Sequence, residues 1–289
     1  MGNRTIRYSE IFYSLQGEGV YTGVPSTFIR LWGCNLHCDG FLQPDPTNPS
    51  TYIDIVRDPD LTYVNDIKEL PPFKRGCDSA YSWNKHYRKL VKEGTAKEII
   101  DLVLNELNTH SGACYPPHLV FTGGEPMLWQ DQLVELMRKW QNHVGAYDSI
   151  TIETNGTKPI KESLYGYASR PKTSNILWSV SPKLYNVSGE EKGFNPGAIA
   201  SYNEAMRGND LGQLKFVMNN NDDSWEELGE ALFELEKHHV YWPVWIMPVG
   251  VTNKPGDPDT VAIVEKALKY GYNVSMRTHS YIWGSEVGR

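Results

Sequence analysis

Short apolar runs alternate along the chain with longer amphipathic stretches. Runs rich in β-branched and aromatic residues predict seven strands, over 26–33, 118–124, 149–156, 176–183, 213–218, 244–250 and 273–279. Apolar residues at helical spacing predict helices from residue 95, over 131–141, over 196–206, over 224–238 and from 259 or 260 to 270. Capping-box spacing supports two of these helix starts, at Thr95 with Glu98 and at Ser224 with Glu227. The alternation predicts an α/β fold with parallel strands and right-handed crossovers.

Chemically distinctive residues follow the ends of the predicted strands. They are Cys34, the GGEP sequence at 123–126, Asn155, Lys183, Gly250 and His279. In parallel sheets, ligands bind beyond the carboxyl ends of the strands. The sequence therefore predicts one site that gathers these residues at one end of a barrel.

Residues 41–74 interrupt this alternation. The segment is rich in Pro and Asp, and two alternating runs around Asp58–Asp60 suggest a hairpin. It is either an insertion that folds back over the site as a lid or a solvated excursion without a role.

Length and composition indicate a globular protein. With 289 residues, 40% hydrophobic and 22% charged, the chain is expected to form a single domain over 1–289. No apolar run has the length of a membrane span, and the N-terminus does not have a signal-peptide pattern. Only four cysteines argue against a disulfide scaffold and favour a reducing, cytoplasmic setting. The net charge of −7 argues against a direct nucleic-acid partner.

Three cysteines have an interrupted spacing. Cys34 and Cys38 begin a C-x3-C-x2-C pattern, but 38 residues separate Cys38 from Cys77. Thiolates bind iron–sulfur clusters or zinc. Three thiolates leave one iron of a four-iron cluster open, whereas structural zinc needs a fourth ligand, which His37 or Cys114 could supply. Cys114 precedes a strand, opposite the predicted site, and is interpreted as a spare thiol.

The sequence TGGEP at 122–126 places two glycines directly after a strand. Without Cβ atoms, a ligand's amine and carboxylate can approach the backbone. Glu125 would then supply a carboxylate near an ammonium group.

Together these motifs resemble the radical S-adenosylmethionine (SAM) superfamily and, within it, the 7-carboxy-7-deazaguanine synthase family. The resemblance spans nearly the whole chain and rests on YSLQGEGVYTGVPSTFIRLWGCNLHC (13–38), CDSAYSW (77–83), TGGEP, ETNG (153–156), SPK (181–183), KFV (215–217), MPVG (247–250) and RTHSYIW (277–283). The LQGEG sequence discriminates best, because radical SAM enzymes in general lack it. The resemblance implies a partial (β/α)6-type barrel of the radical SAM kind, with an insertion between the second and third cluster cysteines.

The resemblance also implies residue roles. Cys34, Cys38 and Cys77 would bind a 4Fe–4S cluster, whose open iron takes SAM. SAM would contact Asp78, Gly124, Glu125, Glu153, Ser181, Pro182, Lys183, Met247, Pro248, Val249 and Gly250. The substrate would contact Leu15, Gln16, Gly17, Glu18, Arg30, Thr122 and His279, with Arg30 on its carboxylate in a bidentate role. The family's Thr ligand to Mg²⁺ is replaced by Ser79, whose hydroxyl is the same kind of hard ligand.

Single residues keep other interpretations. Arg30 could instead pair with Glu18 or Glu153, His279 could be a hydrogen-bonded core residue, and Glu153 could be a structural acid at a strand end.

The implied activity is the ring contraction of 6-carboxy-5,6,7,8-tetrahydropterin to 7-carboxy-7-deazaguanine with loss of ammonia, in 7-deazapurine biosynthesis. The cofactors are the cluster, SAM and Mg²⁺. The partners are the pterin, a flavodoxin-like or ferredoxin-like electron donor and a second copy of the chain in a homodimer. The alternatives are another radical SAM enzyme, such as an activase or a different heterocycle synthase, and a zinc-stabilised binding protein without catalysis.

Overall fold

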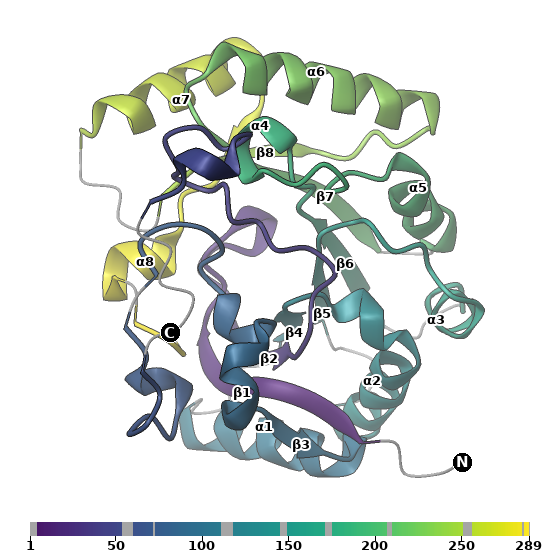
Figure 1. The fold of residues 1–289 in the computed structure, drawn as a ribbon. Coiled ribbons are helices and arrows are strands. Elements are labelled where there is room, and N and C mark those ends of the chain that lie inside the picture. The colour runs from purple at the N-terminus through teal and green to yellow at the C-terminus, as the bar shows by residue number, and fades with distance from the viewer. Residues whose placement is uncertain are drawn as a thin grey trace.

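A single curved sheet runs through the protein, with helices along its outer face (Figure 1). The computed structural model describes residues 5–53, 60–71, 73–110, 118–144, 149–170, 175–206, 210–250, 256–284 and 286–288. The strand order is β3-β1-β2-β4-β5-β6-β7-β8-β9. The order begins at β3 and ends at β9, so the sheet is open and is not a closed barrel.

Seven strands pair in parallel, as the sequence predicts. They are β2 (Pro25–Leu31), β4 (His118–Gly123), β5 (Ser149–Thr154), β6 (Asn175–Val180), β7 (Leu211–Met218), β8 (Val244–Pro248) and β9 (Asn273–Val274). The helices are α1 (Ala96–His110), α2 (Gln130–Val144), α3 (Glu162–Ala168), α4 (Tyr185–Ser188), α5 (Pro196–Ala205), α6 (Asp222–Lys237), α7 (Pro258–Lys269) and α8 (Thr278–Trp283).

Two strands were not predicted. β1 (Ile6–Leu15) pairs antiparallel with β2, and β3 (Lys92–Gly94) pairs antiparallel with β1. β1 carries Glu10 in its middle, where a buried acid hides the strand pattern.

The two faces of the sheet have different roles. On β7, Leu214, Phe216 and Met218 pack into the main core with the helices, while Lys215 and Val217 line a pocket on the other face. This follows from the alternation of side chains along a strand. The concave face therefore carries the polar groups that form the site.

Several predicted boundaries differ from the structure, and three of them have a clear local cause. Residues 273–279 form a strand only at Asn273–Val274, and the chain turns into α8 because Thr278 N–H donates to the carbonyl of Gly17 at 3.1 Å. Helix α6 begins before Ser224, since the Asn221 side chain caps it. Helix α7 begins at Pro258, since Asp257 accepts a hydrogen bond from the Thr260 N–H.

The segment 41–74 contains two short 3-10 turns, η2 (Pro49–Thr51) and η3 (Ile67–Glu69). Residues 54–59 and 72 lie outside the described part, and so does most of the proposed hairpin turn; no strand is present in residues 41–53 or 60–71. Its second half packs into a small separate core: Leu61, Ile67 and Leu70 with Trp32, Tyr81, Tyr87 and Leu90. Among the described residues, no helix has the length and apolar character to cross a membrane.

Candidate active site

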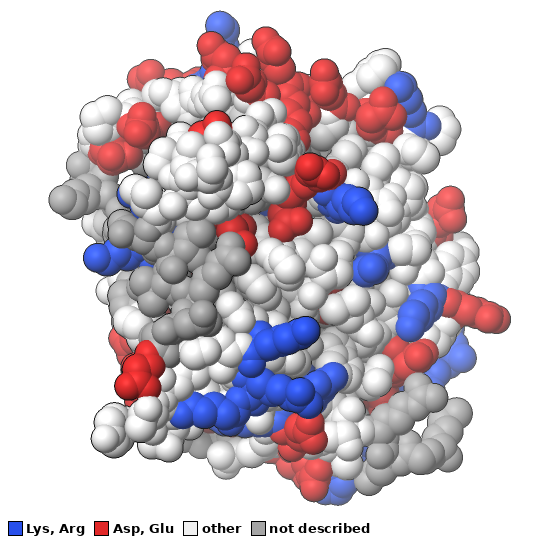
Figure 2. Space-filling view, viewed as in Figure 1, with Lys and Arg blue, Asp and Glu red and all other residues white. Residues whose placement is uncertain are grey.

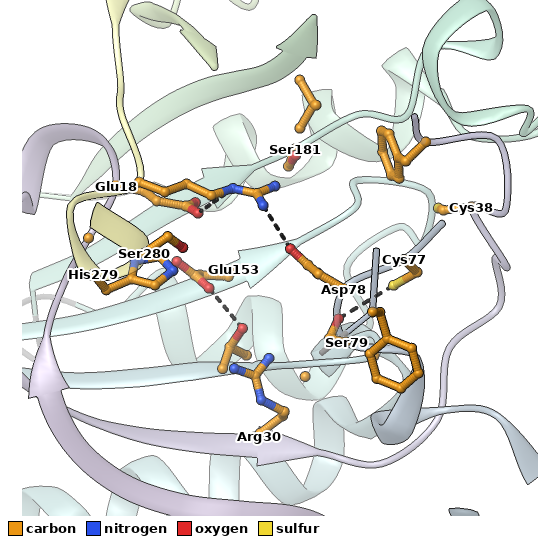
Figure 3. A pocket seen from close by; sticks show the side chains of 18 of the residues that line it. Glu18, Arg30, Cys38, Cys77, Asp78, Ser79, Glu153, Ser181, His279 and Ser280 are labelled. Atoms are coloured by element: carbon orange, nitrogen blue, oxygen red, sulfur yellow. Dashed lines mark hydrogen bonds and ion pairs between the residues drawn. The ribbon is translucent and has the colours of Figure 1, made fainter. Parts of the chain in front are cut away.

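A cavity of about 300 Å³ opens on the concave face of the sheet, at the carboxyl ends of the parallel strands. That volume is at the lower end of the range for small-ligand sites. Figure 3 shows the thiols of Cys38 and Cys77 on one side of it, Glu18 and His279 on the other, and Arg30 reaching in from β2.

Most of the residues predicted from the sequence line this cavity. They are Leu15, Gln16, Gly17, Glu18, Arg30, Cys34, Cys38, Cys77, Asp78, Ser79, Thr122, Gly124, Glu153, Ser181, Lys183, Met247, Val249, Gly250 and His279. Glu125, Pro182 and Pro248 do not line it. The three cysteines of the interrupted motif therefore line one cavity, together with strand-end residues.

The three thiols at one end of the cavity are free and largely buried. Burial raises the pKa of Cys34 to about 12, and it also raises the pKa values of Cys38 and Cys77. The Leu36 N–H donates to Cys34 Sγ at 3.4 Å, and the Trp83 indole N–H donates to Cys77 Sγ at 3.4 Å. Burial therefore favours the neutral thiols; as thiolates, the three groups would need a cationic partner, and N–H donors aimed at sulfur suit a bound cluster.

The described residues contain no ready-made site for a single metal ion. Within the described ranges, no three His, Cys, Asp or Glu side chains converge as one metal ion requires. Cys114, one candidate fourth ligand, lies outside those ranges. A four-iron cluster is larger than one ion, so its thiolate ligands can lie further apart around the cavity.

The loop from Cys34 to Cys38 is held by Glu190, in the segment after α4. Glu190 Oε1 accepts hydrogen bonds from the N–H groups of His37 (2.5 Å) and Cys38 (2.6 Å). Cys38 itself has a left-handed backbone, with φ of 50°. His37 stacks on Trp83 with ring centroids 4.9 Å apart, which joins this loop to the Cys77 segment.

The GGEP turn fits tightly against the neighbouring strand. A Cβ atom on Gly123 would lie 2.2 Å from the Leu31 carbonyl oxygen, and one on Gly124 would lie 2.2 Å from that of Gly33. Glu125 is fully buried and accepts hydrogen bonds from Met127 N–H (2.8 Å), Thr154 Oγ1 (2.7 Å) and Asn155 N–H (2.7 Å). Glu125 thus holds the ends of β4 and β5 together and does not line the cavity, and its contact with SAM stays a prediction.

A polar network forms the far side. Glu153 accepts hydrogen bonds from Thr122 Oγ1 (2.8 Å), Gln16 Nε2 (3.2 Å) and the Lys215 ammonium (3.4 Å). Lys215 also donates to Glu18 at 2.7 Å. Glu153 therefore lies among predicted substrate residues, whereas the sequence predicted a SAM contact.

A second cation bridges the two sides. Arg277 donates to Asp78 at 2.9 Å and lies 3.6 Å from Glu18. Burial would raise the pKa of Glu18, but Lys215 and Arg277 outweigh it and lower that pKa, so Glu18 stays ionised. This connection links the loop after Cys77 to the Gln16–Glu18 loop.

Arg30 has a partner that the sequence did not identify. Its Nε donates to Glu10 Oε1 at 2.7 Å, and the Tyr81 hydroxyl donates to the same oxygen at 3.0 Å. The guanidinium lies between the rings of Phe12 and Tyr81. With Nε fixed in this way, the two terminal nitrogens of Arg30 are available at the cavity, in the fork geometry that binds carboxylates.

His279 closes the cavity against Gly17. A Cβ atom on Gly17 would lie 1.8 Å from His279 Nδ1, so any larger residue at position 17 would require the His279 ring to move. Burial lowers the pKa of His279, so the ring is held neutral near pH 7.

Sequence reasoning missed several lining residues: Tyr81, Lys215, Arg277 and residues 286–288 near the C-terminus. Lys215 was detectable as the one charge in an otherwise apolar strand. The chain end had no local signal, because its place depends on packing of Val287 against the small core formed with the insertion.

Comparisons with known proteins agree with the motifs. No family model matches the chain. It is 27% identical to the 7-carboxy-7-deazaguanine synthase of Pyrobaculum aerophilum, over 98% of this chain and 97% of the relative. It is 26% identical to the enzyme of that name from Leptospira interrogans, over 100% of both chains, and 28% identical to that from Halobacterium salinarum, over 95% and 89%.

Among solved structures, QueE from Escherichia coli has a similar fold. The TM-score is 0.53 at 22% identity, covering 95% of each chain. The resemblance deduced from the motifs is thus confirmed, and the mixed α/β fold is shared.

Proposed function

We infer that this chain, a relative of the 7-carboxy-7-deazaguanine synthases over nearly its whole length, is a radical SAM lyase. It contracts the ring of 6-carboxy-5,6,7,8-tetrahydropterin to 7-carboxy-7-deazaguanine with loss of ammonia, in 7-deazapurine biosynthesis. One observation carries the inference. Three free cysteines from an interrupted motif and the guanidinium of Arg30 line the same cavity at the carboxyl ends of the strands.

The residues present fit the implied cofactors. Cys34, Cys38 and Cys77 would hold a 4Fe–4S cluster, and that cluster with SAM supplies the one-electron chemistry that opens the reaction. SAM would bind among seven further residues that line the same cavity: Asp78, Gly124, Ser181, Lys183, Met247, Val249 and Gly250. Lys183 donates to Ser181 at 2.9 Å, which fixes both side chains at the wall.

The polar network would recognise the pterin. Gln16, Thr122 and Lys215 converge on Glu153, and together these groups offer donors and acceptors for a heterocycle edge. The terminal nitrogens of Arg30 would bind the substrate carboxylate. The rings of Phe12 and Phe28, stacked 4.8 Å apart, make this part of the cavity apolar and limit access of water.

Ser79 is our candidate ligand for Mg²⁺. Its hydroxyl lines the cavity, 3.5 Å from Cys77 Sγ. A hydroxyl oxygen together with substrate oxygens is a suitable donor set for Mg²⁺. Replacing Ser79 with Ala should raise the Mg²⁺ concentration needed for half-maximal rate, and Ser79→Thr should restore it; equal Mg²⁺ dependence of all three proteins would exclude this role.

Further parts of the proposal concern architecture and partners. We regard the parallel strands as the partial (β/α)6-type barrel of a single radical SAM domain. Phe41, Leu42, Pro71 and Phe73 belong to the insertion and line the cavity, which supports a lid over the site. A one-electron donor, a homodimer and a reducing cytoplasmic setting are carried over from the resemblance and the free thiols.

Anaerobic reconstitution tests the function. About four irons per chain, with visible absorbance that bleaches on reduction, are expected. Mass spectrometry should then detect 7-carboxy-7-deazaguanine from the tetrahydropterin, SAM and dithionite. Arg30→Ala or Gln16→Ala should abolish pterin turnover while SAM cleavage continues. SAM cleavage without product from the unaltered chain would indicate another radical SAM activity, and stoichiometric zinc without cluster uptake would exclude the enzyme.

A further inference from the structure

A group of exposed cations lies on the segment that carries the third cysteine. Residues 74–92 contain six Lys and Arg residues against one acid in a chain with a net charge of −7, and one of the six, Lys92, pairs with Asp66 at 3.2 Å. Four of the exposed cations form what we call the basic surface: Lys74, Lys85, Arg88 and Lys89. Figure 2 shows Lys and Arg side chains gathered below the centre of this face, over the short helical turns drawn there in Figure 1.

The basic surface is directly connected to a cysteine of the site. The 3-10 turn η5 (Lys85–Leu90) begins two residues after Trp83. The Trp83 indole donates to Cys77 Sγ at 3.4 Å, and its ring stacks on His37, next to Cys38. On the other side of Cys77, Lys74 lies three residues away. An electron arriving at this surface is therefore close to the thiols that line the cavity.

The opposite charge dominates the top of the same face. Helix α6 contains seven Asp and Glu residues and one Lys, and Figure 2 shows acidic side chains along the top of the molecule, where Figure 1 places α6. An acidic protein that approaches this face is repelled at α6 and attracted at the basic surface. Complementary charge of this kind steers encounter and orientation more than it adds affinity.

We propose that the basic surface is the docking site for a small acidic one-electron carrier protein, which reduces the group held by Cys34, Cys38 and Cys77. The inference rests on the proposed function, because a reductive reaction needs such a partner. The carrier loses one electron, the cluster gains it, and no proton or chemical group crosses the interface. Electron-transfer partners commonly use small, charge-steered interfaces, and a local patch on an otherwise acidic chain fits that pattern.

The test compares two reductants on two matched variants. The first variant is Lys74→Glu/Lys85→Glu/Arg88→Glu, whose three residues have no side-chain role in the cavity. The control is Arg138→Glu/Lys161→Glu/Lys269→Glu, which makes the same change in net charge on α2, before α3 and on α7. SAM cleavage is measured for each holoenzyme with dithionite, and with an acidic flavodoxin kept reduced by its reductase.

With flavodoxin at low ionic strength, the first variant should be at least about tenfold slower than the control, and added salt should shrink the difference. With dithionite, all proteins should cleave SAM at similar rates. Equal flavodoxin-supported rates in both variants would overturn the docking site while leaving the enzyme assignment intact. Absence of SAM cleavage with dithionite in the unaltered holoenzyme would overturn the assignment itself.

Binding gives a readout that is independent of turnover. Oxidised flavodoxin labelled with a fluorophore should bind the unaltered chain and the control variant, and should bind the first variant at least about tenfold more weakly. If the first variant instead loses affinity for an RNA duplex and keeps affinity for flavodoxin, the surface serves nucleic acid and our proposal is wrong.

Discussion

Removing the Glu190 carboxylate should release the loop that presents Cys38. Glu190 Oε1 accepts two backbone hydrogen bonds, from His37 and Cys38. Hydrogen bonds to charged groups contribute about 1.5–3 kcal/mol each, so the pair is worth roughly 3–6 kcal/mol before screening by solvent. Since Glu190 is only partly buried, we take about 2–3 kcal/mol as the net value.

That value has to be compared with the strain in the loop. A left-handed backbone costs a residue with a side chain about 1–2 kcal/mol, and Cys38 adopts one at φ 50°. The net stabilisation from the two hydrogen bonds to Glu190 is therefore slightly larger than the cost of the left-handed backbone at Cys38. Glu190→Ala removes both bonds, so the Cys38 backbone should relax and move its thiol. Glu190→Gln keeps an acceptor oxygen with neutral bonds of about 0.5–1.5 kcal/mol each, which roughly balances the strain.

The assay is iron retention after anaerobic reconstitution and desalting, with amide hydrogen exchange at residues 37 and 38. Glu190→Ala should lose most of its iron and exchange fastest, and Glu190→Gln should be intermediate. Glu191→Ala is the control, because Glu191 is the exposed next residue. If Glu190→Ala retains as much iron as Glu191→Ala, Glu190 does not hold the loop.

Three further changes test other parts of the site and the core. Arg30→Lys keeps the positive charge but loses the two parallel N–H donors of the guanidinium. It should lower kcat/KM for the pterin roughly 10–100-fold, the equivalent of one charged hydrogen bond, while SAM cleavage is kept. An unchanged kcat/KM would place the substrate carboxylate elsewhere. Gly17→Ala places a Cβ atom 1.8 Å from His279 Nδ1 and should raise KM for the pterin. The control Gly229→Ala, on the exposed face of α6, meets open space and should stabilise the fold by about 0.5–1 kcal/mol in urea unfolding. If Gly17→Ala and the unaltered chain have equal KM values, His279 can move without consequence. Burial lowers the pKa of His118 from 6.5 to about 4, so the unfolded chain binds the proton more readily than the folded chain. Stability that is present above pH 6.5 should therefore be lost as the pH falls toward 4, by up to roughly 3 kcal/mol. His118→Gln should reduce the difference in unfolding free energy between pH 7.5 and pH 5, measured with urea, and an unchanged difference would assign the pH dependence to other groups.

The parallel part of the fold could be predicted because its strands are local patterns. Buried runs such as 118–124 and 149–156 combine β-branched and aromatic residues within a few positions, and their order fixes parallel pairing. The placement of the site followed, since one edge of a parallel sheet collects the strand ends.

The remaining features depend on residues far apart in the sequence. Arg30 and Glu10, 20 positions apart, meet because β1 and β2 pair with these two residues opposite each other, and Lys215 and Glu18, 197 positions apart, meet across the concave face of the sheet. Glu125 was expected from its sequence neighbours to meet a ligand, and the fold adds a second task, because its hydrogen bonds hold the ends of β4 and β5 together. Local sequence shows which residues carry chemistry, but it does not show which way a buried carboxylate faces.

The 38 residues between Cys38 and Cys77 are compatible with one cysteine motif because the two ends of the inserted segment lie next to each other. The Gly76 N–H donates to the Phe41 carbonyl at 2.8 Å, and Gly76 uses a left-handed φ of 74° to make that return. Lengthening the spacing between the cysteines from two residues to 38 doubles the loop length roughly four times. Each doubling costs about 0.6 kcal/mol in loop-closure entropy, so the total is about 2.5 kcal/mol. Leu61, Ile67 and Leu70 each gain about 1.5–3 kcal/mol by burial in the small core beside Trp32 and Tyr87, which offsets that cost. The inserted segment can therefore cover one side of the cavity without loosening the cysteines at its two ends.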